Sequence, residues 1–483
     1  MRELCDDGAL RARTLLMSAD FELLVVGGGS AGFAAAVRGA ELGARVGLVE
    51  AGTLGGTCVN VGCLPSKTLI RAAEALHRRT HHPFAGVPWS GGAPHWPLIR
   101  EQKDDLVSRL REAKYADVLR SYARVELIRG RAIVRSGPSV ELEDGRIIRA
   151  RKFIVTTGAA PWTPQIPGLG ELEYLDSTSA MALDRLPASM IVIGGSAVGL
   201  ELAQMFARLG VRVTVLEVMP RLVPAEANGI GEALAACLRD EGLEIFTSAV
   251  VQRVQRDSGY QVTFNIAGES RQLRAEQLLV ATGRRANTGG LRLDGAGVTL
   301  GSKGEVVVDG HLRTSNPDIY AAGDVTGEPM FVYVAAYAGN TAADNALNDN
   351  LQQYDLTAVP RVTFTDPAIA TVGMSAEEAA AAGFRTLTSE LPLEHVPRAL
   401  AARDTRGFIR LVADASTRRL LGAHILAAEA GEMITEPVLA IRFGLTIDDL
   451  ASSFHPYLTL SEGIKLAAQA FDKDVAKLSC CAA

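Results

Sequence analysis

One short pattern occurs twice in the chain, and it restricts the fold more than any other feature. Residues 21–26 (FELLVV) are an apolar run followed by a glycine-rich turn and a helical stretch, and residues 46–50 (VGLVE) end in Glu50. Residues 190–217 repeat this order and end in Glu217. A strand, glycine turn, helix and second strand are typical of a dinucleotide-binding unit. The sequence therefore predicts an α/β protein with two Rossmann-like, doubly wound nucleotide-binding domains.

The first turn contains Gly27, Gly29 and Gly32 in the spacing G-x-G-x-x-G. Glycines let the backbone approach a pyrophosphate, and the N-terminus of the following helix offers N–H donors to it. Glu50 lies about 20 residues further on, where a carboxylate accepts from a ribose hydroxyl. A turn that serves only close packing is the alternative, and the strand–helix–strand context favours dinucleotide binding over it.

The second turn contains Gly194, Ser196 and Gly199, so a small serine replaces the middle glycine. Glu217 ends the second strand, where a carboxylate can bind a ribose 2′-hydroxyl and repel a 2′-phosphate. This residue favours NADH as the electron donor. Arg221 lies four residues further on and could reach a 2′-phosphate, so NADPH remains the alternative.

Residues 55–67 (GGTCVNVGCLPSK) combine Cys58, Cys63 and Lys67. In an ideal helix, a separation of five positions rotates two side chains roughly 140° apart. A disulfide between the cysteines therefore requires a distorted turn, and Gly62 makes that distortion cheap. A helix N-terminus and nearby cations are expected to lower the thiol pKa values. We expect a redox-active pair rather than two unrelated buried cysteines.

Together these motifs resemble the FAD-dependent pyridine nucleotide–disulfide oxidoreductase family over residues 20–483. The resemblance implies FAD and NADH or NADPH as cofactors, a homodimer, and a C-terminal α+β dimerisation domain. It implies an N-terminal extension (1–19), a discontinuous FAD domain (20–165 and 285–354), an NAD(P) domain (166–284) and a dimerisation domain with a Cys-Cys tail (355–483).

The resemblance also assigns roles to individual residues. Cys63 is expected to face the flavin and Cys58 to be the outer thiol, while Lys67 and Glu201 form an ion pair near the flavin. The residues expected to contact FAD are Gly27, Gly29, Ala31, Gly32, Glu50, Gly52, Thr57, Lys67, Ala132, Asp324 and Val332. Those expected to contact the nicotinamide nucleotide are Gly194, Ser196, Gly199, Glu217 and Gly283.

The segment FHPYLTLSEG departs from the H-P-T-x-x-E segment of disulfide reductases in this family. Alignment through T-L-S-E keeps Glu462 and places Tyr457 where the catalytic histidine belongs. A register that uses His455 instead needs a two-residue insertion before Glu462. Because a tyrosine with an ordinary pKa near ~10 is a poor base at neutral pH, a disulfide substrate is disfavoured. Tyr457 and Glu462 are nevertheless candidate catalytic residues.

Cys480 and Cys481 end the chain as a second pair. Adjacent cysteines do not readily close a relaxed disulfide, but their thiolates can bind a soft metal ion. An inert tail is the alternative. With YLTLSEGIKLAAQAF and LSCCAA, the resemblance is to those family members that reduce Hg(II) to Hg(0). It implies that Hg(II) arrives as a thiol complex, is bound by Cys480 and Cys481 of the partner subunit, and passes to Cys58 and Cys63.

Composition and charge argue against macromolecular partners. The net charge of −6 gives no basic surplus for nucleic acid or an anionic membrane, and no apolar run reaches the ~20 residues of a membrane span. We therefore expect a cytoplasmic protein. Cys5 lacks a second cysteine nearby, so we expect it to be incidental and an N-terminal metal-binding domain to be absent. Two rival functions are a dihydrolipoamide dehydrogenase-like disulfide reductase and a metal-sequestering flavoprotein.

Overall fold

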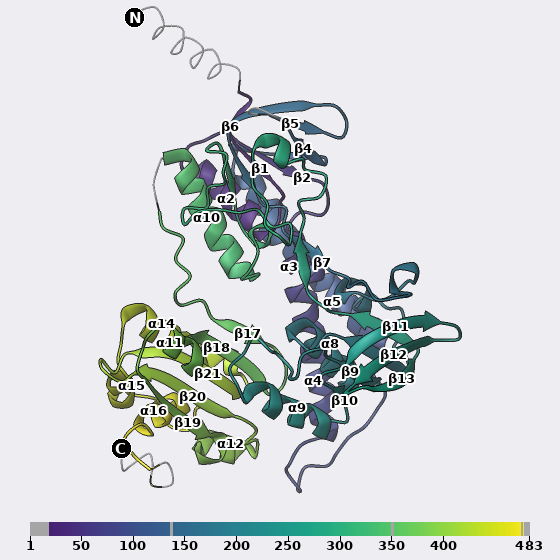
Figure 1. Ribbon diagram of the computed structural model, residues 1–483, viewed down its shortest axis with the longest axis vertical. Coiled ribbons are helices and arrows are strands. Elements are labelled where there is room, and N and C mark those ends of the chain that lie inside the picture. Colours follow the sequence, from purple (N-terminus) through teal and green to yellow (C-terminus); the bar gives the residue numbers. More distant parts are fainter. Residues whose placement is uncertain (1–18, 136–138, 349–351, 475–476, 478–483) are drawn as a thin grey trace, which may run out of the picture. The chain divides into compact units, whose positions relative to one another are not determined.

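The computed structural model describes residues 19–135, 139–348, 352–474 and 477. These residues divide into two compact units, each assembled from several segments of the chain. Figure 1 labels many of the helices and strands of both units. Unit 1 contains the described residues of Met1–Thr68, Arg100–Trp162 and Gly283–Asp355. Unit 2 contains those of Leu69–Ile99, Thr163–Thr282 and Leu356–Ala483.

The first glycine turn follows β1 (Phe21–Val26), a central strand of a seven-stranded sheet in unit 1. β1 pairs in parallel with β2 (Val46–Glu50) and β6 (Ile147–Val155). Its middle residues are fully buried, as expected for a parallel strand covered on both faces. The other strands of this sheet are β3 (Val125–Arg129), β4 (Ala132–Val134), β5 (Ser139–Leu142) and β16 (Ile319–Ala321).

Helices α2 (Ser30–Glu41) and α10 (Val332–Asn348) pack closely against each other in unit 1 (Figure 1). Small residues permit the approach, because a Cβ atom on Gly339 would lie 2.1 Å from the carbonyl oxygen of Ala31. The first turn of α2, which begins at the glycine turn, therefore touches α10 directly. Unit 1 also contains α3 (Gly56–Val61), α6 (Asp117–Ser121), β7 (Ala159–Pro161) and β15 (Arg284–Ala286).

The second glycine turn lies in unit 2, in a four-stranded parallel sheet. The turn joins β8 (Ser189–Ile193) to α8 (Ala197–Arg208), in which residues 199–206 are all buried. The remaining strands of the sheet are β9 (Arg212–Leu216), β10 (Glu244–Phe246) and β14 (Gln277–Val280). An antiparallel sheet follows within the same unit, formed by β11 (Val250–Arg256), β12 (Tyr260–Ile266) and β13 (Glu269–Ala275).

The C-terminal part of unit 2 is a five-stranded antiparallel sheet with helices. Its strands are, in spatial order, β17 (Arg361–Thr363), β18 (Ala368–Gly373), β21 (Leu420–Ala427), β20 (Phe408–Asp414) and β19 (Thr386–Pro392). Its helices include α14 (Thr435–Phe443), α15 (Ile447–Ser452) and α16 (Glu462–Gln469). With the two nucleotide-binding sheets, this α+β part confirms the predicted fold class.

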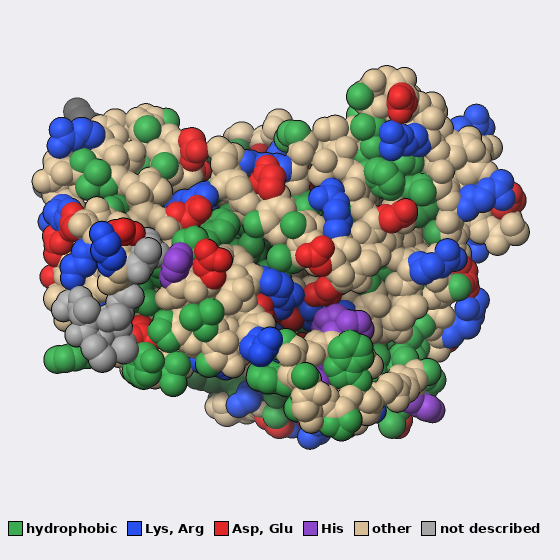
Figure 2. All heavy atoms as spheres, turned by 90° about the horizontal axis from the view of Figure 1, so that it is seen from below, with side chains coloured by type: hydrophobic (Ala, Val, Ile, Leu, Met, Phe, Trp, Pro, Cys, Tyr) green, Lys and Arg blue, Asp and Glu red, His purple; other side chains and the backbone are tan. Residues whose placement is uncertain are grey.

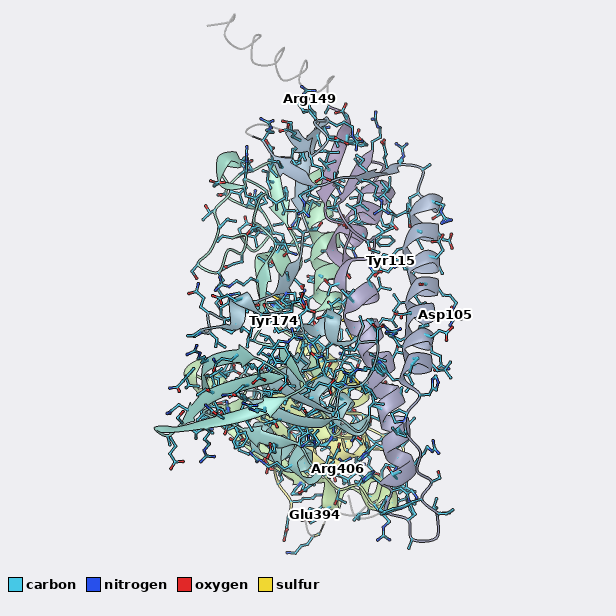
Figure 3. All side chains as sticks on the ribbon, turned by 90° about the vertical axis from the view of Figure 1, so that its right-hand side faces the viewer. Asp105, Tyr115, Arg149, Tyr174, Glu394 and Arg406 are labelled. Atoms are coloured by element: carbon cyan, nitrogen blue, oxygen red, sulfur yellow. The ribbon has the colours of Figure 1, made fainter. Side chains whose placement is uncertain are left out.

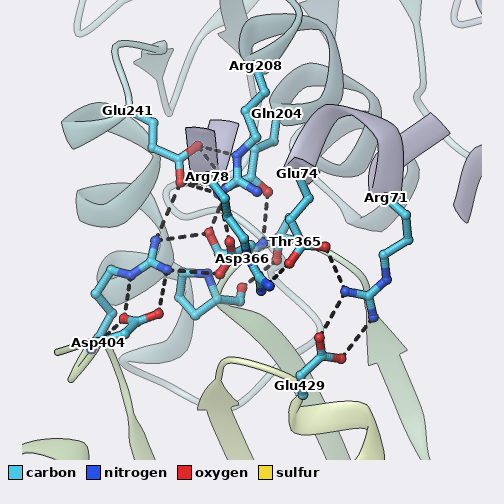
Figure 4. Close-up of polar contacts among 12 residues, drawn as sticks. Arg71, Glu74, Arg78, Gln204, Arg208, Glu241, Thr365, Asp366, Asp404 and Glu429 are labelled. Carbon is cyan, nitrogen blue, oxygen red and sulfur yellow. Dashed lines mark hydrogen bonds and ion pairs between the residues drawn. The ribbon is translucent and has the colours of Figure 1, made fainter. Parts of the chain in front are cut away.

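A cluster of charged side chains joins the nucleotide-binding and C-terminal parts of unit 2 (Figure 4). Arg208, whose side chain is 4% exposed, donates hydrogen bonds to Glu241 at 2.6 Å and to Asp366 at 2.9 Å. Arg406 bonds Asp366 at 2.9 Å and Asp404 at 2.8 Å. Each buried charge in this cluster thus has an opposite charge beside it, which offsets the cost of removing it from water.

On the face shown in Figure 2, Lys and Arg side chains lie among Asp and Glu side chains. Within the part of the chain that the structure describes, none of the helices is long and apolar enough to cross a membrane. The cytoplasmic location and the domain boundaries proposed from the sequence stay predictions.

Candidate active site

At the first glycine turn, neighbouring backbone atoms lie too close to leave room for a side chain. A Cβ atom on Gly27 would lie 2.5 Å from the carbonyl oxygen of Thr156, and one on Gly32 would lie 1.8 Å from the carbonyl oxygen of Gly27. Gly29 is the N-cap of α2 and offers no side-chain cap to it. The N–H groups of the first helical turn are therefore left for a ligand, as a pyrophosphate site requires.

Glu50 completes this cradle at the end of β2. Its two carboxylate oxygens each accept a backbone hydrogen bond at 2.6 Å, one from Gly28 and one from Gly52. The carboxylate is thereby fixed beside the glycine turn, where it can accept from a ribose hydroxyl. These residues fit the adenosine diphosphate part of FAD.

A third segment meets the same turn. A Cβ atom on Gly323 would lie 2.9 Å from Cβ of Ala31, so the A-A-G-D segment lies against the first turn of α2. Asp324 follows in this segment, and its burial raises the pKa of its carboxyl group. Val332 is the first residue of α10, and Ala132 begins β4. The structure thus brings Asp324 to the predicted cofactor site, while the contacts of Val332 and Ala132 with FAD stay predictions.

Cys58 and Cys63 lie on two consecutive helices rather than on one. Helix α3 ends at Val61, Gly62 interrupts the helical conformation, and α4 (Cys63–Thr80) begins at Cys63. The interruption lets the side chains of Cys58 and Cys63 meet in a hydrogen bond. A Cβ atom on Gly56 would lie 2.6 Å from Cα of Gly29. The cysteine-bearing helix α3 therefore begins against the FAD cradle, with Thr57 in its first turn.

The thiol of Cys58 does not have the lowered pKa that the sequence predicted. The hydrogen bond with the Cys63 side chain, burial and the charge of Cys63 raise the pKa of Cys58, while a hydrogen bond with the Cys63 backbone and the charge of Lys67 act in the opposite direction. Cys58 is half-buried and Cys63 is exposed. The expectation was wrong for Cys58, because it considered helix and cation effects and omitted the neighbouring thiol. The pKa of Cys58 is thus coupled to the neighbouring Cys63 thiol.

Tyr115 is a neighbour of this pair that the sequence analysis missed. It lies in a π-helical turn, Glu112–Ala116, which follows helix α5 (Trp96–Arg111), where Figure 3 also labels Asp105. Burial and the charges of Cys58 and Cys63 raise the pKa of its hydroxyl, which hydrogen-bonds Ser30. Short π-helical segments occur often at functional sites, but nothing in the sequence spacing indicated that this tyrosine reaches the cysteines.

The second glycine turn has the same geometry as the first. A Cβ atom on Gly194 would lie 2.3 Å from the carbonyl oxygen of Ala281, and one on Gly199 would lie 2.1 Å from the carbonyl oxygen of Gly194. Ser196 is the exposed N-cap of α8, and its hydroxyl makes no capping bond. Glu217 follows β9 with its carboxylate buried against the turn. These residues fit a second dinucleotide.

The predicted partners Lys67 and Glu201 lie in different units. Glu201 is buried in α8, where its carboxylate accepts a hydrogen bond from the backbone N–H of Phe364 at 2.9 Å. The Lys67–Glu201 ion pair stays a prediction. Gly283 begins the third segment of unit 1 with a φ of +120°, and its contact with the nicotinamide nucleotide also stays a prediction.

The C-terminal candidates are arranged around one loop. Tyr457 is 56% exposed, whereas Glu462 is buried and accepts a hydrogen bond from the backbone N–H of Leu458 at 3.3 Å. His455 pairs instead with Glu436 of α14. Cys5, Cys480 and Cys481 lie outside the described residues. Among the residues that are described, no group of three or more His, Cys, Asp or Glu side chains could hold a metal ion.

Comparisons with known proteins match nearly the whole chain. The family model "Pyridine nucleotide-disulphide oxidoreductase" matches residues 21–339, and its dimerisation domain matches residues 359–468. The chain is 47% identical over 464 residues to a mercuric reductase of Staphylococcus aureus, covering 96% of this chain and 84% of that protein. It is 47% identical over 468 residues to a mercuric reductase of Streptomyces lividans, covering 96% and 98%.

A solved structure with the same fold is the HOCl-induced flavoprotein disulfide reductase RclA from Escherichia coli. It matches with a TM-score of 0.83 and 31% sequence identity, and covers 93% of this chain and 99% of that chain. The two glycine turns, the thiol pair and the C-terminal sheet thus occur together in a flavoprotein architecture.

Proposed function

Because the chain belongs to the pyridine nucleotide-disulphide oxidoreductase family, we propose that it is a mercuric reductase that converts Hg(II) to Hg(0) with NAD(P)H. Members of this family depend on FAD and NAD(P)H, and the matched dimerisation domain fits a homodimer. The observation that carries the proposal is the 47% identity to mercuric reductases over 96% of the chain. The Cys58–Cys63 pair beside the FAD cradle supports it.

Bound FAD supplies the relay of two electrons between the nicotinamide and the thiols. The Gly27 turn and Glu50 hold its adenosine diphosphate part, and the Gly194 turn and Glu217 hold the nicotinamide nucleotide. With FAD bound, Cys63 would be the thiol that exchanges electrons with the flavin, and Lys67 and Glu201 are the proposed ion pair that would contact it. Cys58 is the outer thiol, which would bind the metal ion as a thiolate together with Cys63.

The substrate is Hg(II) in a complex with two thiols. Soft thiolates are its preferred ligands, so it moves by ligand exchange from Cys480 and Cys481 of the partner subunit to Cys58 and Cys63. Tyr457 and Glu462, which lie in the C-terminal part, assist this transfer. In the balanced reaction, one NAD(P)H, one proton and one Hg(II)–dithiolate complex give NAD(P)⁺, Hg(0) and two free thiols.

A disulfide reductase related to dihydrolipoamide dehydrogenase is the alternative. That activity needs a general acid that protonates the departing thiolate. In this chain Tyr457 occupies the aligned position, and the imidazole of His455 is engaged by Glu436 at 2.8 Å. These two observations favour the metal substrate over a disulfide.

The experiment that tests the proposal compares substrates for the FAD-loaded dimer. Oxidation of NAD(P)H is followed by absorbance, with Hg(II) and excess low-molecular-weight thiol, with lipoamide, or with glutathione disulfide. We expect NAD(P)H oxidation with Hg(II), matched by release of Hg(0) vapour at equal stoichiometry. Turnover with a disulfide and none with Hg(II) would contradict the proposal.

A further inference from the structure

The carboxylate of Glu217 lies against the second glycine turn, where a dinucleotide-binding unit binds the adenosine ribose. Its Oε2 atom accepts a hydrogen bond from the backbone N–H of Gly195 at 2.6 Å, and its Oε1 atom accepts from that of Met219 at 2.8 Å. The side chain is buried. Two backbone donors therefore fix both oxygens, so the carboxylate cannot swing aside to admit a second anion.

Unit 1 provides an internal reference for this arrangement. Glu50 accepts from the backbone N–H groups of Gly28 and Gly52 at 2.6 Å each, in the same positions relative to its turn as Glu217. The adenosine ribose of FAD carries a free 2′-hydroxyl. Because Glu217 repeats the geometry that suits an unphosphorylated ribose, the second turn is built for the same kind of ribose.

The two residues after Glu217 carry no positive charge that could bind a 2′-phosphate. Sites for a 2′-phosphate commonly use an arginine near this position. Here Val218 and Met219 follow, and their side chains are 59% and 46% exposed. A phosphate at this place would therefore face a carboxylate and two apolar side chains.

Arg221 is the first cation after Glu217 in the sequence, and its guanidinium is bound within its own loop. It donates to the carbonyl oxygens of Pro224 and Glu226, at 3.0 Å each, and to the side chain of Asn228. Reaching a ligand would require Arg221 to give up these acceptors. In the sequence, NADPH remained an alternative because Arg221 could reach a 2′-phosphate. The structure removes this argument, because Arg221 is bound to other acceptors.

From these contacts we infer that the protein uses NADH in preference to NADPH, and that Glu217 determines this specificity. The inference rests on the proposed function for the overall reaction, because it names the electron donor of that same site. Repulsion between the carboxylate and a 2′-phosphate should weaken the binding of NADPH and slow the reduction of the flavin by NADPH. We expect a preference for NADH of about tenfold or more in kcat/KM.

The first test uses the FAD-loaded dimer without any mercury, so its outcome is independent of the metal substrate. Anaerobic stopped-flow absorbance measures flavin reduction by NADH and by NADPH. Calorimetry measures the binding of ADP-ribose and of its 2′-phosphorylated form. We expect faster reduction by NADH and tighter binding of the unphosphorylated fragment. Equal or better values for NADPH and for the phosphorylated fragment would overturn the inference, whether or not Hg(II) is a substrate.

The second test uses matched variants. Glu217→Ala combined with Val218→Arg removes the carboxylate and supplies a cation, and we expect it to shift the NADH to NADPH ratio of flavin reduction at least about tenfold toward NADPH. Glu244→Ala removes another carboxylate of the same sheet and should leave the ratio unchanged. Arg221→Ala should also leave it unchanged, and a selective loss of NADPH reduction would show that Arg221 binds the 2′-phosphate. Should the double variant not fold, the fragment calorimetry on the unmodified protein still decides the question.

Discussion

The Nε2 atom of His455 lies 2.8 Å from Oε1 of Glu436. This hydrogen bond raises the pKa of His455 above its ordinary value, although burial acts in the opposite direction. The backbone carbonyl of Ser453 lies 3.2 Å from the other ring nitrogen. The imidazole is therefore held by groups of its own C-terminal part, two residues before the exposed Tyr457.

This pair predicts a pH-dependent contribution to stability. A raised pKa in the folded state means that the stabilisation is complete below the ordinary histidine value of about 6.5. It is lost as the pH rises through the higher folded-state pKa. His455→Gln should therefore lower the melting temperature of the FAD-loaded dimer at pH 6, by about 2–4 °C, and have a smaller effect at pH 9. Glu436→Gln should reproduce this pattern, and an equal loss at both pH values would contradict it.

Replacing either thiol of the active pair should abolish the reaction and leave the cofactor bound. In Cys58→Ser and Cys63→Ser, Hg(II)-dependent NAD(P)H oxidation should fall to the background rate, because serine oxygen is a poor ligand for a soft metal. The flavin absorbance per subunit should not change. Cys237→Ser, which alters a half-buried cysteine in α9 (Ile230–Asp240), is the matched control and should keep full activity. Substantial turnover in either active-pair variant would rule out the proposed route.

Tyr115→Phe tests the residue that the structure adds to the site. Because burial and the charges of Cys58 and Cys63 raise the pKa of the Tyr115 hydroxyl, the hydroxyl stays protonated and can donate a hydrogen bond near the thiols. Its removal should lower kcat/KM for Hg(II) about tenfold, the value of one hydrogen bond, with unchanged flavin reduction. Ser30→Ala should have a smaller effect, and a Tyr115→Phe variant with normal kcat/KM would remove Tyr115 from the mechanism.

The delivery route can be tested by mixing subunits. A Cys58→Ser, Cys63→Ser variant and a Cys480→Ser, Cys481→Ser variant should each be inactive when Hg(II) is held by a tight thiol chelator. Their heterodimer should recover activity at no more than one site, because one intact pair then meets the intact tail of the other chain. Heterodimers verified by mass that stay inactive would mean that the tail serves its own subunit or delivers no metal.

The cofactor predictions depended on the spacing of residues that lie close together in the sequence. The glycines of each turn and the acids Glu50 and Glu217 lie within single strand–helix–strand units, so their chemistry could be read from the sequence. At Gly27 and Gly194, however, the carbonyl groups that exclude a side chain belong to Thr156 and Ala281, on segments far along the chain. Those contacts explain why the turns need glycine, and no local pattern reveals them.

The rest of the site depends on tertiary contacts. Tyr115 reaches the cysteines through the packing of a distant helix, and Glu436 meets His455 across the C-terminal part. The direction of the Cys58 pKa shift depends on burial and on its coupling to Cys63. These quantities arise only once the chain has folded, so spacing and residue type could not supply them.

The charged cluster of Figure 4 also limits how this protein can be recombined with its relatives. Arg208 and Glu241 come from the nucleotide-binding part, while Asp366, Asp404 and Arg406 come from the C-terminal part. In a chimera joined near residue 355, the C-terminal part from the second parent must supply the equivalents of Asp366, Asp404 and Arg406. Without Asp366, Arg208 would keep its hydrogen bonds to Glu241 but lose the one to Asp366, and the contact between the two parts would be weakened. Crossovers that keep all five residues from one parent should therefore yield folded hybrids more often than crossovers that divide them.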